Sequence, residues 1–420
     1  MNRRMAVCFL SITICSAINL AGCAKPAPVP IPELKKDYDR PLPPGALALR
    51  KITDPAMLPN FGQAYYNAQN GDLQRSIKNS LHYLAKPSSK KYFPYGEVSH
   101  DQAVASLNAF LELLATARSP EEFDQAIKER FDTYISVGCD DQGTVLYTGY
   151  YCPIFDGSLT RTERFRYPIY KKPPELKIDP NDPDGKPIGG PWKTRQEIEG
   201  SQALAGHELV WLGDRFETYV VNVQGSGRIR MPGGRLLEIG YAGNNGHEYT
   251  SVARELIADG KMSKEGLSLD AMIAYFRANP ADLDIYLPRN PRYIFFQEVK
   301  GGPFGCLSEP VLPMHSIATD KEIFPRACLA LIDTDLAVKT DGGKRRYVGF
   351  ACDQDRGAAI RAAGRCDIFR GTGDEAGRLA GHTYSEGKLY YVFLKPEYLN
   401  QPPGAASPIA TGDSPATEPH

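Results

Sequence analysis

The glycine-punctuated stretch RFETYVVNVQGSGRIRMPGGRLLEIGYAG, residues 215–243, constrains the fold of this chain more than any other segment. Apolar and polar residues alternate along it, and glycines interrupt the alternation. Alternation with a period of two indicates strands that bury one face, and glycine clusters between such runs are typical of hairpin turns. We therefore predict consecutive β-hairpins here, within a body that is mainly β from about Thr144 onward.

The segment before this β-rich region has a helical period. Apolar residues recur at helical spacing at Leu73, Ile77, Leu81 and Leu84. Ser99 and Ser119 each stand three residues before a Gln or Glu, which is the pattern of a capping box at a helix start. We expect helices from Leu73 to about Ile135, a further helix within 262–280, and a final β-rich stretch over 293–394.

Both ends of the chain differ in composition from the body. Residues 1–22 have a short basic start and an apolar run, as a secretory signal peptide does. LAGC at 20–23 resembles the lipobox of bacterial lipoproteins, in which the cysteine, here Cys23, is lipidated; the alternative is an ordinary cleaved signal. Residues 23–45 are a proline-rich tether, and 399–420 lack the apolar content to pack.

Charge and cysteine usage exclude several classes of protein. After removal of 1–22 the chain holds 47 basic and 50 acidic residues, a balance of −3, which is no nucleic-acid-binding footprint. Six cysteines remain beyond Cys23, and the sequence does not choose between their disulfide pairings. They form no C-x-x-C pair, so we expect no zinc site. The length suits two domains.

Carboxylates crowd the C-terminal β-rich stretch. Asp353 and Asp355 lie two positions apart at the end of a predicted strand, so alternation predicts that they share one face. A like charge nearby raises the pKa of a carboxyl, which would suit a general acid. The alternative is that these aspartates only bond backbone amides in a turn. The chain has no G-x-S-x-G, H-E-x-x-H or P-loop motif that would favour another chemistry.

Three glycine-containing segments have the composition of a binding surface: TGYYCPIFDGS at 148–158, VQGSGRIR at 223–230 and GYAGNNGHEYTS at 240–251. Glycine lets a ligand approach the backbone, and amides, hydroxyls and aromatic rings suit a neutral polar ligand such as a sugar chain. Tight hairpin turns with no binding role are the alternative for the last two.

These segments, together with RTERFRYPIY, NPRYIFF, QDRGAAI and GTGDEAGRLAG, resemble the MltA family of membrane-bound lytic murein transglycosylases over residues 144–395. The resemblance implies a mainly β fold with a helical N-terminal elaboration, in which a second β-barrel is inserted into a double-psi β-barrel, with a groove between them. The first barrel would comprise 46–156 and 289–398, and the inserted, substrate-binding barrel 157–288.

The resemblance also implies a site and an activity. Asp355 in QDRGAAI would be the single general acid and base that cleaves the bond between N-acetylmuramic acid and N-acetylglucosamine in peptidoglycan, by endo or exo attack, with a 1,6-anhydro product. The expected substrate-binding residues are Tyr150, Tyr151, Gln224, Ser226, Gly227, Tyr241, Asn244, Asn245, Asp367 and Asp374.

The implied partners are peptidoglycan glycan strands, outer-membrane lipid through acylated Cys23, and other cell-wall enzymes. The implied location is the periplasmic face of the outer membrane. Two alternatives stay open: a lipoprotein that binds peptidoglycan without cutting it, and a hydrolase that uses two carboxylates, with Asp367 or Asp374 as the base.

Overall fold

The computed structural model of the protein describes residues 36–179, 185–263, 269–339 and 343–399. Its strands form one sheet of eight strands and one of six. The predicted signal peptide, Cys23, most of the tether and nearly all of the C-terminal tail lie outside the described residues. Among the helices that are described, none is both long and apolar enough to cross a membrane.

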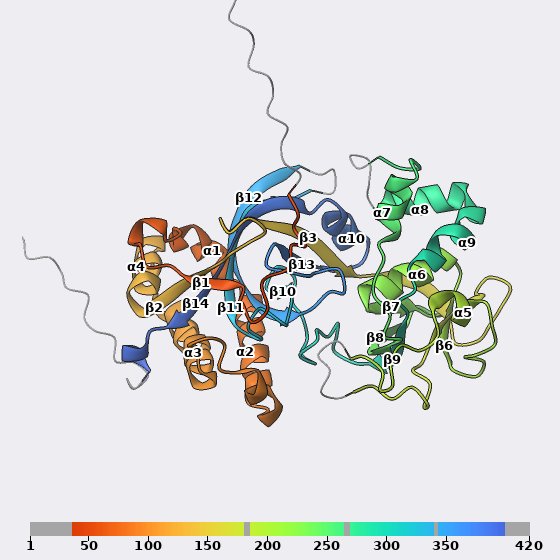
Figure 1. Ribbon diagram of the computed structural model, residues 1–420, viewed down its shortest axis with the longest axis horizontal. Coiled ribbons are helices and arrows are strands. Elements are labelled where there is room, and N and C mark those ends of the chain that lie inside the picture. The colour runs from red at the N-terminus through yellow and green to blue at the C-terminus, as the bar shows by residue number, and fades with distance from the viewer. Residues whose placement is uncertain (1–35, 180–184, 264–268, 340–342, 400–420) are drawn as a thin grey trace, which may run out of the picture. The chain divides into compact units, whose positions relative to one another are not determined.

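Six strands of the larger sheet close into a ring (Figure 1). In order around the ring they are β14 (Tyr384–Leu394), β11 (Leu329–Ala337), β12 (Lys344–Asp355), β10 (Ser316–Ala318), β13 (Arg365–Thr372) and β3 (Val145–Cys152), and β3 pairs back onto β14. β10 runs parallel to β12 and β13 parallel to β3, whereas the other ring pairs are antiparallel. β2 (Phe131–Ser136) pairs with β14, and β1 (Leu49–Lys51) with β2. Closure pairs each of the six ring strands on both sides, and β1 is the edge strand of the two-strand extension from β14.

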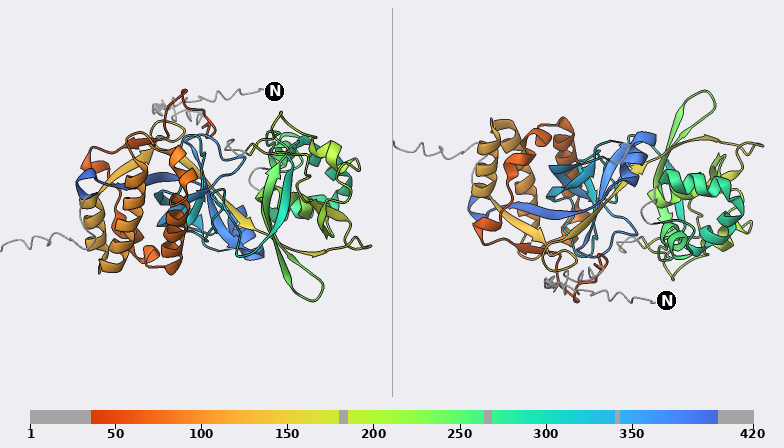
Figure 2. Two further views of the ribbon diagram at one scale, coloured as in Figure 1. Left: turned by 90° about the horizontal axis from the view of Figure 1, so that it is seen from below. Right: turned by 90° about the horizontal axis from the view of Figure 1, so that it is seen from above.

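Helices that precede the ring strands in sequence pack against the ring and share its core (orange in Figures 1 and 2). They are α1 (Tyr65–Ala68), α2 (Gly71–Leu84), α3 (His100–Thr116) and α4 (Pro120–Arg130), with 3-10 turns η1 (Pro55–Met57), η2 (Phe61–Ala64) and η3 (Pro87–Tyr92). Phe110 of α3 and Phe123 of α4 are fully buried against Phe350 of β12, with the Phe110 and Phe350 ring centroids 4.7 Å apart. Buried aromatic area of this kind fixes the helices on the ring.

The six-stranded sheet is inserted between β3 and β10. Its order is β5 (Tyr167–Tyr170), β6 (Glu208–Leu212), β4 (Ile154–Ser158), β7 (Ser226–Arg230), β8 (Leu236–Asn244) and β9 (Ile294–Val299). A single bridge between Lys171 and Phe296 brings the end of β5 beside β9, so this sheet also curls toward closure around its own core. By strand pairing the insert runs from Ile154 to Val299, several residues beyond each predicted limit.

The remaining helices belong mainly to the insert. They are α5 (Arg195–Glu199), α6 (Arg215–Gln224), α7 (Val252–Ala258), α8 (Leu269–Ala278) and α9 (Leu283–Tyr286), with η4 (Pro280–Asp282) and η5 (Leu287–Arg289); α10 (Asp374–Gly381) and η6 (Pro396–Tyr398) lie in the C-terminal part. Phe216 of α6 and Phe276 of α8 share a buried cluster with Tyr151 of β3 and Ala380 of α10. This cluster joins the insert to the ring.

The predicted fold class is confirmed, since the described chain is mainly β with helices before the ring. Residues 215–224 are an exception, because the predicted first strand of the hairpin series is helix α6. Asp214 caps this helix and Gly225 ends it with a φ of 72°. The helix buries Phe216, Val220 and Val221 on neighbouring turns, so the same apolar residues that alternate locally also fit a helical stripe.

The helix starts agree with the prediction, but the predicted helical stretch ends earlier. Ser99 and Ser119 accept hydrogen bonds from Gln102 N–H and Glu122 N–H and so cap α3 and α4. The stretch that we expected to be helical to Ile135 turns into strand β2 at Phe131.

Candidate active site

Asp355 stands at the last position of β12, where the strand leaves the ring. The pairing with β10 shifts at this point: Ile317 pairs with Asp353, but the next residue, Ala318, pairs with Asp355. Gln354 is therefore an extra residue on β12, and such a bulge bends a strand and redirects its side chains. The shift breaks the alternation that placed Asp353 and Asp355 on one face.

The Asp355 carboxylate is half-buried and accepts two amide hydrogen bonds on the same oxygen. Arg356 N–H donates to Oδ1 at 2.8 Å, and Cys306 N–H, from the loop between β9 and β10, donates to it at 2.9 Å. Burial raises the pKa of Asp355 to about 6, against the lowering effect of these amides and of the Tyr150 hydroxyl. The carboxyl is therefore suited to hold and release a proton near neutral pH.

Asp353 has a different environment. It is fully buried, and its carboxylate accepts hydrogen bonds from Thr319 Oγ1 at 2.7 Å, from Tyr391 Oη at 2.8 Å and from the Lys321 ammonium. Paired in this way, Asp353 is a structural residue. Our expectation that its charge raises the pKa of Asp355 was wrong about the main cause, because burial is the dominant effect.

Asp367 is the second acid of the site. Ala318 of β10 pairs with Asp355 on one side and with Asp367 of β13 on the other, so about two strand spacings of about 4.8 Å separate the two backbones. Burial raises the pKa of Asp367 to about 7, and the charge of Asp355 adds to the rise. Its Oδ1 is buried without a hydrogen-bond partner among the described residues.

Of the two predicted tyrosines on β3, Tyr150 lies near Asp355 and Tyr151 packs against the insert. Tyr150 Oη is buried and makes no complete hydrogen bond to a described residue, but it lies close enough to Asp355 to lower the pKa of that carboxyl. Tyr151 is buried in the cluster that joins ring and insert, and its N–H donates to Gln224 Oε1 at 3.1 Å. The structure thus brings Tyr150, Asp355 and Asp367 together.

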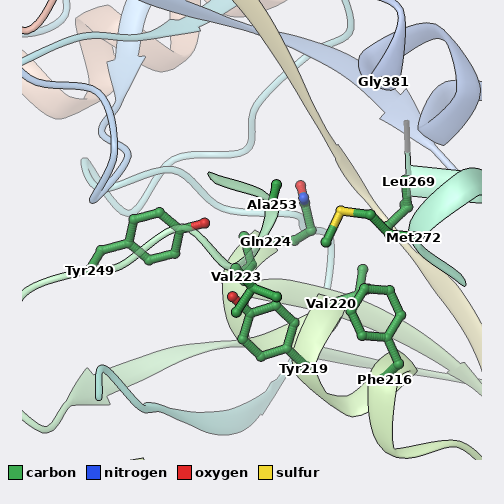
Figure 3. A pocket seen from close by; sticks show the side chains of 11 residues that line it. Phe216, Tyr219, Val220, Val223, Gln224, Tyr249, Ala253, Leu269, Met272 and Gly381 are labelled. Atoms are coloured by element: carbon green, nitrogen blue, oxygen red, sulfur yellow. The ribbon is translucent and has the colours of Figure 1, made fainter. Parts of the chain in front are cut away.

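Gln224 also lines a cavity of ≈ 230 Å³ in the insert (Figure 3). Its walls come from α6, α7, α8 and the end of α10; Phe216, Tyr219 and Met272 supply apolar surface, and Gln224 and Tyr249 supply polar groups. A cavity with aromatic walls and a few polar groups is typical of a ligand-binding pocket.

Several other predicted binding residues lie in the interior. Asn244 and Asn245 are fully buried; Asn244 Nδ2 donates to Gly185 O at 3.0 Å, and Asn245 Nδ2 donates to Lys193 O at 2.9 Å and Pro291 O at 2.8 Å. Ser226 and Gly227 are buried within β7. The side chains of Asn244 and Asn245 therefore bond the protein itself, and Ser226 and Gly227 lie inside the second sheet.

Tyr241 and Asp374, by contrast, are exposed. The Tyr241 side chain is 42% exposed, and Asp374 begins α10 beside the Tyr151 hydroxyl. All six cysteines beyond Cys23 are described, and all are free thiols in this structure.

Comparison with known proteins agrees with this architecture. The MltA specific insert domain matches residues 146–297, and the 3D domain matches 315–393. Membrane-bound lytic murein transglycosylase A of Vibrio cholerae serotype O1 is 31% identical over 264 residues, which are 61% of this chain and 68% of that protein. The chain belongs to the MltA family.

Solved structures of MltA proteins agree with this membership. The crystal structure of Escherichia coli MltA with bound chitohexaose has a TM-score of 0.67 and 26% identity, over 86% of this chain and 100% of that one. The membrane-bound lytic murein transglycosylase of Agrobacterium tumefaciens has a TM-score of 0.67 and 25% identity, over 84% of this chain and 99% of that one.

The two MltA family domains leave out residues that contact the candidate site. Cys306, which holds Asp355 through its amide, lies between the two matched segments, and helix α2 lies before them. Sequence reasoning missed Cys306 because a backbone N–H carries no side-chain signal. Gly305 was the available clue: a Cβ there would lie 2.5 Å from Gln354 O, so only glycine lets this loop approach the strand end so closely.

Proposed function

We propose that this chain, a lytic murein transglycosylase of the MltA family, cleaves peptidoglycan with Asp355 as its single general acid and base. The observation that carries the proposal is the half-buried Asp355 carboxyl, whose pKa of about 6 lies in the range where a group both donates and accepts a proton. Membership in the family supplies the reaction, and the burial and raised pKa of Asp355 support its choice as the catalytic residue.

The reaction follows from one carboxyl and the substrate. Asp355 gives its proton to the oxygen that links N-acetylmuramic acid to N-acetylglucosamine as that bond breaks. The carboxylate then takes the proton of the muramic C6 hydroxyl while this oxygen bonds to C1, which leaves a 1,6-anhydro ring and restores protonated Asp355. An intramolecular nucleophile has a large effective molarity, so no water has to be activated. The single-acid reaction calls on no metal or cofactor.

Amide hydrogen bonds decide which oxygen carries the proton. Arg356 N–H and Cys306 N–H both donate to Oδ1 and stabilise negative charge on that atom. Protonation therefore falls on Oδ2, which becomes the oxygen that faces the glycosidic bond.

Asp367 supports a second candidate, hydrolysis by two carboxylates. Its place across one strand from Asp355 is compatible with the separation of about 6.5–9.5 Å found in inverting hydrolases. A general base must be ionised, however, and burial raises the pKa of Asp367 to about 7, above that of Asp355. This order of pKa values makes Asp367 a poor base below neutral pH, so we favour the single-acid mechanism.

Glycan strands are the proposed ligand, since the Escherichia coli relative was solved with bound chitohexaose. Tyr150, Gln224, Tyr241 and Asp374 are the proposed contacts, because each is at least partly accessible or faces Asp355. The relatives are membrane-bound. We extend this to attachment at the periplasmic face of the outer membrane through lipidated Cys23, with other cell-wall enzymes as further partners.

Product analysis on purified sacculi tests the proposal. We expect the chain without its lipid to release muropeptides with 1,6-anhydro ends that borohydride cannot reduce, and Asp355→Asn to release none while still binding sacculi. Reducing ends in the wild-type products would establish hydrolysis instead. Binding without any product from the wild-type chain would establish a non-catalytic peptidoglycan-binding protein.

A further inference from the structure

The loop that donates Cys306 N–H to Asp355 is a compact turn over residues 303–312. Gly305 N–H donates to Glu309 O at 2.9 Å, Ser308 N–H donates to Gly305 O at 2.9 Å, and Val311 N–H donates to Pro303 O at 2.9 Å. Cys306 therefore sits at the start of a closed turn, and the position of its amide depends on where that turn is held.

Side chains from α2 and from Lys86, which follows that helix, hold this turn. Glu309 is buried, with a side chain only 5% exposed, and its Oε1 lies 2.7 Å from His82 Nδ1 and 2.5 Å from Lys86 Nζ. Asn79 Nδ2 donates to Pro310 O at 2.8 Å. Asn79 and His82 lie three residues apart on one face of α2, and Lys86 lies just beyond the end of that helix, immediately before η3.

The same helix holds the strand residue that precedes Asp355. Gln354 Nε2 donates to Ser76 O at 2.7 Å and to Ser80 Oγ at 3.0 Å, and Gln354 is fully buried. α2 thus fixes both the end of β12 and the turn whose amide binds the Asp355 carboxylate.

We propose that Glu309 is a positioning residue for Asp355: its carboxylate, held by His82 and Lys86, fixes the 303–312 turn so that Cys306 N–H stays on Asp355 Oδ1. This inference rests on the proposed function of Asp355. The Glu309 side chain contacts His82 and Lys86, so it acts on Asp355 through the backbone of its turn.

Loss of the Glu309 contact has a specific expected consequence. If the turn moves, the Asp355 carboxylate keeps its hydrogen bond from Arg356 N–H but loses the one from Cys306 N–H. With one donor instead of two on Oδ1, the carboxyl is held less firmly and can rotate. A displacement of about 1 Å at a reacting group costs on the order of a hundredfold in rate. Substrate affinity comes from surfaces elsewhere and stays nearly constant.

The experiment compares Glu309→Ala, the shape-conserving Glu309→Gln, and Asp132→Asn in the lipid-free chain on a soluble glycan-strand substrate. Asp132 makes a Lys51 ion pair of 2.7 Å on β2 and is the matched control. We expect kcat of Glu309→Ala to fall tenfold to a hundredfold with KM within about twofold, Glu309→Gln to recover much of the loss, and the control to equal wild type.

The pH profile separates positioning from general loosening. Cys306 N–H lowers the pKa of Asp355, so its loss should move the alkaline limb of kcat to higher pH in Glu309→Ala. The other groups near this carboxyl, Lys321, Tyr150, Asp367 and Arg356, are the same in all variants. Iodoacetamide labelling of Cys306, read by peptide mass spectrometry, should also become faster because the turn covers its thiol.

Two results would overturn the inference: an unchanged kcat in Glu309→Ala, or a lower kcat with an unmoved alkaline limb and unchanged Cys306 labelling. An Asp355→Asn arm keeps the two proposals apart. Full activity of Asp355→Asn would refute the proposed function, and Cys306 labelling would still decide whether Glu309 holds the turn.

Discussion

The end of β12 and the turn after β8 are both polar and glycine-flanked in sequence, but they use their polar groups in opposite ways. At the turn, Asn245 Oδ1 accepts from Tyr293 N–H at 2.8 Å and its Nδ2 donates to two carbonyl groups, so the amide is fully occupied by the protein. At the strand end, Asp355 has hydrogen bonds to one oxygen from described residues, and nearby Asp367 Oδ1 has none.

This difference separates scaffold from site better than residue type does. A buried polar group with all its hydrogen bonds stabilises the fold, whereas one left incomplete costs stability and is kept where it serves a function. Asp353, two residues before Asp355, belongs with Asn245 in this respect, because three side chains occupy its carboxylate. The contrast leads to four predictions, from the largest effect to the smallest.

Asp353→Ala should have the largest effect on stability. It leaves the buried Lys321 ammonium without its carboxylate, which costs about 3–5 kcal/mol for a broken buried ion pair. Denaturant unfolding measures the loss. A cost below about 1 kcal/mol would show that Asp353 is not scaffold, and would weaken its contrast with Asp355.

Asn245→Ala should destabilise the insert by about 2–3 kcal/mol, because three hydrogen bonds are lost and two carbonyls and one N–H stay buried. Tyr241→Phe in the preceding strand β8 removes one hydroxyl from a half-exposed residue and should cost under about 1 kcal/mol. Thermal unfolding compares the two. If Asn245→Ala folds stably but loses glycan binding, the turn is a binding site after all.

Asp355→Asn should stabilise the protein by about 1–2 kcal/mol at pH 8 and have little effect at pH 4. The pKa of Asp355 is raised from 3.8 to about 6 in the folded state, so the cost of ionising the buried carboxyl grows as the pH rises from about 4 to 6 and is fully present above that range. Denaturant unfolding at the two pH values measures the difference. Equal effects at both pH values would mean that folding does not raise the pKa of the Asp355 carboxyl.

Asp367→Asn should have the smallest effect, a shift of the alkaline limb of kcat to lower pH by a fraction of a unit. The negative charges of Asp355 and Asp367 repel each other, so removing the Asp367 charge lowers the pKa of Asp355. A pH–rate profile measures the shift. Inactivation as complete as that of Asp355→Asn would instead assign the reaction to the acid pair.

The helices before the ring could be predicted from the sequence because their caps and their apolar stripes involve residues close together in the chain. Ser99 and Ser119 cap helices whose starts the sequence marks, and the apolar stripe of α2 faces the core. The sequence did not distinguish α6 from a strand, because Phe216, Val220 and Val221 fit both the helical and the strand period. Their packing within the insert, which local sequence does not record, favours the helix.

The candidate site was predictable only in part, for a physical reason. Asp355 could be found because a carboxyl at a strand end is visible in the sequence and lies in a motif of the family. The bulge at Gln354 depends on strand register, the Cys306 amide contacts a residue 49 positions away, and Glu309 contacts His82 of α2 across 227 positions. No local pattern records such contacts.

The two points at which the chain enters and leaves the insert lie at the same end of the ring strands. β3 runs out at Cys152 opposite Thr372, and the returning chain meets the same end of β13, where Met314 N–H donates to Phe369 O at 2.8 Å. The insert is therefore connected covalently to the ring by two neighbouring segments of chain. No ring strand has to be rerouted to remove the insert, so a variant with a short linker across that gap would test whether the ring closes without it.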